Sequence, residues 1–280
     1  MIKKQGISLK NLITHLSLII FVAFLAFPFI VMIGTSLKPY KEIISWPPKI
    51  LPSDISISNF FDAWSSTYNL KLGFINSIII SISTMILCIL IGTIAAYSLA
   101  RFKFTGKKTF LFLILVTQMF SQVVLIVPLY NIINKLNLLN TYTSLIIANT
   151  AVSLPMCIWM LTGFFKEMSP SLEEAAMIDG CSRIQSIFKI IFPIGAPSIV
   201  AVGIFSFINT WNDVLFSMIF ITDTKMRPIT LMLLDFKSQY QVHWNLLMAG
   251  AVIAVIPITI LFIGIQKYLV KGLVAGTDKE

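Results

Sequence analysis

The sequence predicts an all-α fold, a polytopic membrane protein with six transmembrane helices and a cytoplasmic helix-turn-helix loop. Hydrophobic residues make up 57% of the 280 residues and charged residues only 12%, and the mean hydropathy is +0.88. Ordinary soluble domains have an apolar share nearer ~45–50%. Several apolar runs of about 20 residues can each cross ~30 Å of hydrocarbon as a helix. The composition therefore excludes an ordinary soluble domain.

Six spans can be drawn through these apolar runs. They cover residues 16–35, 73–99, 109–133, 144–165, 196–221 and 246–268. The first run lacks a small-residue cleavage site and is too long for the apolar core of a signal peptide, so we expect it to be retained. We expect residues 1–280 to form a single transmembrane domain.

A long loop, residues 36–72, follows the first span. It contains Trp46-Pro47-Pro48 and the aromatic segment 59–64, which predicts a short amphipathic helix. Aromatic side chains anchor helices at the membrane interface, and this is the favoured role. The alternative is that the loop helps to receive an extracytoplasmic partner.

Positive charges predict the orientation of the spans. With the N-terminus inside, thirteen Lys and Arg residues lie on the cytoplasmic side and eight on the outer side, and four of the thirteen crowd loop 100–108. Short loops near span ends dominate the positive-inside rule, so we expect both termini in the cytoplasm. The net charge of +9 is then explained by orientation and by anionic lipid, and nucleic acid is not an expected partner.

Polar residues recur at three- and four-residue steps along the fifth span. The candidate residues of a translocation path are Gln118 and Gln122 of the third span and Ser206, Asn209, Thr210, Asn212 and Asp213 of the fifth. Polar side chains are costly against lipid, so we expect these faces to look inward. Hydrogen bonding between helices is the alternative, and for serine and threonine the favoured one. Asp213 differs because an ionisable residue inside a span is functional by default.

A charged island, residues 166–195, separates the fourth and fifth spans. Ser171 and Glu174 have the S-x-x-E spacing of a capping box, which predicts that a helix begins here. Pro170 suits the first turn of such a helix. We expect the helix to end at Gly180.

A second short helix is expected from about Ser182 to Ile191, ending at Pro193. The small side chains of Ala175 and Ala176 would make one face of the first helix narrow enough to fit into a groove on a partner. Three carboxylates would offer contacts to a partner: Glu173, Glu174 and Asp179.

The chain carries no sequence motif for catalysis or metal binding. It has no G-x-x-x-x-G-K-[ST] loop to bind ATP, no H-E-x-x-H, no nucleophile elbow and no Cys/His cluster. Cys88, Cys157 and Cys181 lack metal-ligand spacing, and we expect them to be packing residues. We therefore expect no enzyme activity, no metal and no cofactor in this chain.

The charged island resembles the EAA loop of binding-protein-dependent ABC import permeases. The matching pattern is Glu174-Ala175-Ala176, three residues, Gly180, nine residues, Ile190-x-Phe192-Pro193, in which Phe192 replaces the usual leucine. Further matching segments follow in the family's order over about residues 70–276: Tyr97–Lys107, Pro128–Tyr130, Pro155, Trp211–Asp213 and Gly272–Gly276. The chain is similar to the shorter, six-helix permease subunit of maltose-type carbohydrate importers.

This resemblance implies a permease that moves a sugar or oligosaccharide across the bacterial plasma membrane by alternating access. The implied partners are a second, different permease, two ATPase subunits that bind ATP and magnesium, and an extracytoplasmic solute-binding protein. The island would be the ATPase-coupling loop, with Glu174 facing a basic group. The implied coupling residues are Glu173, Glu174, Ala175, Ala176, Asp179, Gly180 and Pro193.

Two alternatives stay open. An ABC permease for a non-sugar solute, such as a peptide, polyamine or phosphonate, would share the loop but usually not the Trp211-Asn212-Asp213 segment. An ion-coupled secondary transporter acting alone would use Asp213 as a proton or cation site.

Overall fold

The computed structural model describes residues 9–49, 51–65, 69–237 and 241–275, and its named elements over these ranges are all helices. The longest helices are α1 (Leu9–Ser36), α4 (Leu70–Arg101), α7 (Tyr142–Glu167), α10 (Phe192–Trp211) and α13 (Trp244–Ala275). Each contributes to one of five segments long and apolar enough to cross a membrane. The all-α membrane fold is confirmed, as are the first, second, fourth and sixth predicted spans.

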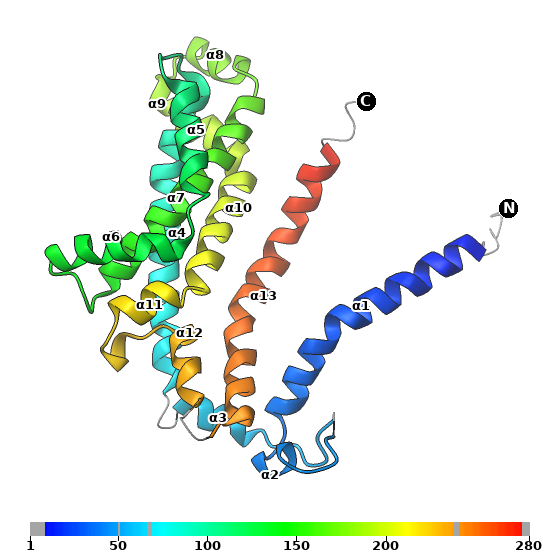
Figure 1. Cartoon of the computed structure of the whole chain (residues 1–280). Coiled ribbons are helices and arrows are strands. Elements are labelled where there is room, and N and C mark those ends of the chain that lie inside the picture. Colours follow the sequence, from blue (N-terminus) through cyan, green and yellow to red (C-terminus); the bar gives the residue numbers. More distant parts are fainter. Residues whose placement is uncertain (1–8, 50, 66–68, 238–240, 276–280) are drawn as a thin grey trace. The chain divides into compact units, whose positions relative to one another are not determined.

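Shorter helices connect or interrupt these segments (Figure 1). They are α2 (Tyr40–Ile43), α3 (Ser58–Ser65), α5 (Lys107–Thr117), α6 (Gln122–Lys135), α8 (Ser171–Ile178), α9 (Arg183–Ser186), α11 (Leu215–Phe220) and α12 (Ile229–Met232). A π-helix, η1, covers Ile187–Ile191, and 3-10 turns η2 and η3 cover Thr224–Met226 and Leu233–Phe236.

The third predicted span, 109–133, is wrong as a continuous helix. It is broken into α5 and α6, which are bent by 100° from one another. The Ser121 side chain caps α6 by accepting a hydrogen bond from Val123 N–H. Beside the break, the Gln118 side chain donates to the Val152 carbonyl of α7 at 3.3 Å. The Ser121 hydroxyl thus replaces one backbone bond that a continuous helix would make internally, and Gln118 fastens the end of α5 to α7.

The fifth predicted span, 196–221, is also interrupted. The α10 helix ends at Trp211 and α11 begins at Leu215. Asp213 lies between them and accepts hydrogen bonds from Phe216 N–H (3.1 Å), Ser217 N–H (3.0 Å) and the Ser217 hydroxyl (2.8 Å). The carboxylate therefore satisfies donors at the start of α11, as a helix-capping residue does.

Contacts within the chain cluster in two units. The first unit comprises Met1–Asn69 and Asp235–Ile253, and the second comprises Leu70–Leu234 and Ala254–Glu280. The single domain expected over residues 1–280 stays a prediction.

The buried Asn59 links three segments of the first unit. The Asn59 amide of α3 donates to the carbonyls of Ser36 and Lys38, both at 2.8 Å. Its oxygen accepts from the Asn245 amide at 2.8 Å. The short helix predicted in this loop is confirmed as α3, and its asparagine ties the end of α1 to the start of α13.

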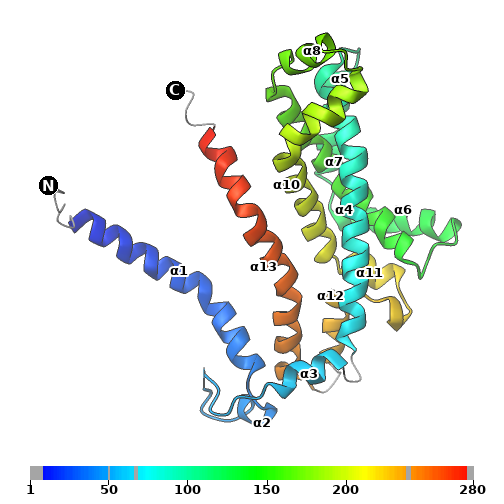
Figure 2. The same ribbon diagram turned by 180° about the vertical axis from the view of Figure 1, so that it is seen from behind.

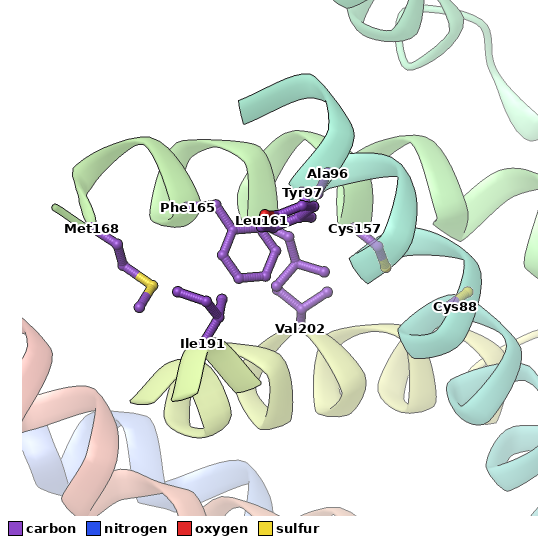
Figure 3. Packing of buried hydrophobic residues seen from close by; sticks show 9 residues of the cluster. All are labelled: Cys88, Ala96, Tyr97, Cys157, Leu161, Phe165, Met168, Ile191 and Val202. Atoms are coloured by element: carbon purple, nitrogen blue, oxygen red, sulfur yellow. The ribbon is translucent and has the colours of Figure 1, made fainter. Parts of the chain in front are cut away.

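The second unit has a core where α4, α7 and α10 pack together. Its buried cluster consists of Cys88, Ala96, Tyr97, Cys157, Leu161, Phe165, Met168, Ile191 and Val202. Figure 3 shows these side chains converging between the three helices. Cys88 and Cys157 are free and buried in this core, as expected of packing residues.

A further apolar cluster holds the broken spans in place. Ile133 of α6 and Phe216 and Phe220 of α11 pack against Ile80 of α4 and Leu145 of α7. Burial of these side chains stabilises α6 and α11, which are too short to be stable helices alone.

Gly73 allows α12 to lie against α4. A Cβ atom at this position would lie 2.6 Å from Met232 Sδ and 3.2 Å from the backbone of Ile229. Contacts below 3.4 Å require a neighbour to move, and here one neighbour is backbone.

We expect Gly73→Ala to destabilise the protein by about 1–3 kcal/mol, because overpacking forces backbone shifts. Gly163→Ala in α7 is the matched control, since a Cβ there meets no atom within 4 Å. Alanine in a helix interior is favoured over glycine by about 0.5–1 kcal/mol, so the control should be neutral or stabilising. Thermal denaturation midpoints in detergent measure both. Equal midpoints would contradict the close packing.

Candidate functional site

The charged island forms a helical hairpin at one end of the second unit. Figures 1 and 2 show α8 at the end where α5 begins, and α12 lies at the opposite end. The predicted capping box is wrong in its residues. The Ser169 hydroxyl accepts from Ser171 N–H at 3.3 Å, and Ser171 is already the first residue of α8. The helix thus begins where expected, with Ser169 as the capping side chain.

Gly180 ends α8 as predicted. Its φ of +85° lies in the left-handed region, where glycine has no steric cost. Cys181 N–H donates to the Ala176 carbonyl at 3.0 Å, and Gly180 N–H donates to the Met177 carbonyl at 3.1 Å. This pair of bonds is the Schellman motif, which turns the chain sharply after a helix.

The second short helix does not end at Pro193, contrary to the prediction. From Arg183 the chain runs through α9 and the π-helix η1 into α10, and residues 184–211 form one candidate membrane segment. Phe192 N–H bonds to the Ile187 carbonyl, five residues back. Pro193 lies in the first turn of α10 and lacks an N–H of its own. The wider π-turn accommodates the proline without ending the helix.

Glu173 faces inward and is not a surface contact for a partner, contrary to the prediction. It is 6% exposed, and its carboxylate forms an ion pair with Arg101 Nε. The Tyr97 hydroxyl donates to its other oxygen at 2.8 Å. Arg101 Nη1 also donates to the carbonyl of Met168, the residue after α7, at 3.0 Å. The four groups join the ends of α4 and α7 to the first turn of α8.

The opposite face of α8 is open. Glu174, Ala175, Asp179 and Gly180 are exposed, and Ile178 is 85% exposed. Ala176 is buried, so the two alanines lie on different faces. Leu172 and Met177 of α8 are exposed as well (38% and 37%), and apolar side chains gathered on an exposed surface are typical of a region that a partner covers.

The polar residues of the fifth span divide into two groups. Ser206 and Thr210 are buried and donate to carbonyls of their own helix, those of Gly203 (2.8 Å) and Ser206 (2.9 Å). This favours a structural role for the two hydroxyls. Asn209 and Asn212 are exposed within the described chain, and so are Gln118 and Gln122. These four amides are accessible to a solute or a partner, although Gln118 already donates one bond to the Val152 carbonyl.

Asp213 is 9% exposed, and its carboxylate is occupied by the cap of α11. The Thr230 hydroxyl also donates to the Asp213 carbonyl at 2.7 Å. The residue therefore joins α10, α11 and α12.

Sequence reasoning missed the inward contacts of Tyr97, Arg101 and Asn76. Arg101 was one of four basic residues in a short loop, and nothing in the order of residues says which of them is paired. The opposite charge at Glu173, in the charged island, is the signal that was available. The Asn76 amide donates to the carbonyls of Lys225 and Arg227, both at 2.9 Å, far away in sequence.

Residues 88–274 match the family described as the binding-protein-dependent transport system inner membrane component. The chain is 38% identical over 264 residues to the probable ABC transporter permease protein YurM of Bacillus subtilis, covering 94% of this chain and 86% of YurM. It is 36% identical to the sulfoquinovosyl glycerol transport system permease protein SmoH of Agrobacterium fabrum, covering 89% and 87%. It is 34% identical to the melibiose/raffinose/stachyose import permease protein MelC of Bacillus subtilis, covering 90% and 91%.

Solved structures share the fold. A chain of a bacterial ABC transporter that imports the acidic polysaccharide alginate matches with a TM-score of 0.80 at 19% identity, covering 96% of this chain and 99% of that one. A chain of a bacterial alginate ABC transporter, solved in complex with a periplasmic protein bound to alginate pentasaccharide, matches with a TM-score of 0.66 at 14% identity, covering 92% of each chain.

We expect Asp213→Leu to lower stability by about 1–3 kcal/mol, because it leaves buried backbone donors of α11 without an acceptor. Asp213→Asn is the control, since its amide oxygen can still accept one of these bonds. Thermal denaturation midpoints of the two variants, each against the unaltered protein, make the comparison. If leucine and asparagine were equally tolerated, Asp213 would not cap α11.

Proposed function

The chain belongs to the binding-protein-dependent transport system inner membrane component family, and on this basis we propose that it is the permease subunit of an ATP-driven carbohydrate importer. It is a multi-pass membrane protein whose role is transport. The exposed face of α8 carries the proposal. Glu174, Asp179 and Ile178 are open on a helix whose other face is fixed by a buried ion pair.

We propose that this face docks on an ATPase subunit. The chain carries no ATP-binding motif, so an importer driven by ATP needs a separate ATPase subunit. The Schellman turn at Gly180 and the continuous path from α9 into α10 join the docking face to a membrane segment. ATP and magnesium belong to the partner, and no cofactor is assigned to this chain.

The substrate class follows from the relatives. SmoH and MelC are named for sulfoquinovosyl glycerol and for melibiose, raffinose and stachyose. All of these are sugars or glycosides, which supports a carbohydrate substrate over a peptide, polyamine or phosphonate. The exposed amides of Asn209, Asn212, Gln118 and Gln122 suit hydroxyl-rich solutes, because an amide both donates and accepts hydrogen bonds.

The remaining partners are a second permease and an extracytoplasmic solute-binding protein. The alginate transporter structure that includes a periplasmic protein supports the binding protein. We propose alternating access as the mechanism: closure of the ATPases moves α8, and the membrane helices reorient around the polar path. The bacterial plasma membrane is the proposed location, with both termini in the cytoplasm.

We expect single cysteines at Thr105 and Ser182 to react with an impermeant thiol reagent only after the membrane is opened. One at Ser56 should react in intact cells. The reason is the charge asymmetry, which places loop 100–108 inside. Labelling would be done on a background in which Cys88, Cys157 and Cys181 are replaced by serine. Reaction of the Thr105 position in intact cells would overturn the orientation.

We expect Glu174→Arg to reduce both retention of the ATPase during purification and uptake of radiolabelled raffinose, melibiose or maltose by at least about tenfold. Reversing a charge at an interface sets like charges together and costs several kcal/mol. Glu167→Arg is the matched control, an exposed carboxylate of the same island. Equal behaviour of the two variants would show that α8 does not dock, and the lone secondary transporter would then be favoured.

We expect Gly180→Val to disturb coupling through the backbone alone. The position has φ +85°, and a Cβ would meet no atom within 4 Å. A β-branched residue in the left-handed region costs roughly 1–2 kcal/mol, whereas asparagine tolerates that region. Gly180→Asn should therefore keep uptake near the normal level, while Gly180→Val should lower it. If both variants transported normally, the turn would not direct the hairpin.

A further inference from the structure

The α4 helix ends in a buried polar clamp that holds α8. Arg101 is the last residue of α4, and Glu173 lies in the first turn of α8. Their side chains are only 11% and 8% exposed, and the Tyr97 hydroxyl completes the carboxylate's bonding at 2.8 Å. We call Tyr97, Arg101 and Glu173 the inner clamp.

The charges of the inner clamp suit the helices that carry them. A cation is stabilised at a helix C-terminus and an anion at a helix N-terminus. A buried ion pair adds little stability compared with apolar residues of the same volume, because desolvation offsets the attraction. Its geometry is nevertheless restrictive, since each carboxylate oxygen accepts from a different side chain. The inner clamp therefore specifies position more than it contributes stability.

The other end of α4 carries a second clamp. Asn76 donates to the carbonyls of Lys225 and Arg227, both at 2.9 Å, and Ile229 N–H donates to the Ser77 hydroxyl at 2.8 Å. Tyr142 of α7 donates to the Asn76 oxygen at 2.8 Å. From Ser77 to Arg101 the helix rises about 36 Å, at ~1.5 Å per residue. One continuous helix thus joins the docking hairpin to the segment between α11 and α12.

We propose that α4 transmits the movement of α8 across the membrane, with Tyr97, Arg101 and Glu173 as the positioning residues at the inner end. This inference rests on the proposed function. A push or tilt applied to α8 reaches Arg101 through Glu173 and is carried by a rigid helix to the backbone at 225–229. The docking face itself contributes no residue to the inner clamp.

The test uses the full complex in nanodiscs and proteoliposomes, with its ATPase and binding protein. Radiolabelled raffinose, melibiose and maltose are first compared, and the sugar that the unaltered complex accumulates most is used. Two quantities are then measured: ATP hydrolysis stimulated by the loaded binding protein, and the amount of this sugar taken up per ATP hydrolysed. Glu173→Gln removes the charge and keeps the shape, and Glu167→Gln makes the same change at an exposed site. We expect Glu173→Gln to lower uptake per ATP about fivefold or more, and Glu167→Gln to leave it unchanged.

Tyr97→Phe provides a milder second variant that removes one hydroxyl donor and keeps the ring in the core. It should lower uptake per ATP less than Glu173→Gln, and the double variant should be no worse than Glu173→Gln alone, because both act on one carboxylate. If these residues had only a structural role, the variants would lower the yield of purified complex or its thermal denaturation midpoint. The amount of sugar taken up per ATP hydrolysed would then stay unchanged. If Glu173→Gln and Tyr97→Phe both gave the same uptake per ATP as the Glu167→Gln control, the inference about α4 would fail. The proposed function would be unaffected by that result. An unaltered complex without stimulated hydrolysis or uptake would overturn both.

Discussion

Within a membrane, every backbone N–H and C=O must find a partner inside the protein, and the breaks in this fold depend on that constraint. Interrupting a helix exposes groups at two new ends. At the break between α10 and α11, Asp213 accepts the bonds of Phe216 and Ser217. At the break between α5 and α6, Ser121 caps the second helix. The polar residues that first suggest a pore are in part the residues that make these breaks possible.

The described chain uses its polar residues in two ways. Those that are buried complete the structure, as Asn59 does in the first unit and Glu173 in the second. Those that are exposed, such as Glu174 beside Glu173, remain for other molecules. Adjacent carboxylates on a helix are turned by about 100° from one another, so one can hold the hairpin while the next meets a partner.

Apolar length was sufficient to predict four of the six spans, because a run such as residues 73–99 has few ways to be satisfied in a membrane except as a helix. The same argument failed at 109–133 and 196–221, since hydropathy does not register a capping bond such as that of Asp213. Gly180 was predictable because its φ is a local property. The inward turn of Glu173 was not, because it depends on Tyr97 and Arg101, which are more than 70 residues away in sequence.

The π-turn at Ile187–Ile191 inserts one extra residue between the helical hairpin and α10. Successive residues are turned by about 100° about the axis of a helix. One inserted residue therefore changes the direction in which every later side chain of α10 points relative to α9. Deleting one residue here would swing Ser206 and Thr210 out of their buried positions without altering either helix. The π-turn therefore sets the rotational position of the membrane segment about its own axis relative to the hairpin.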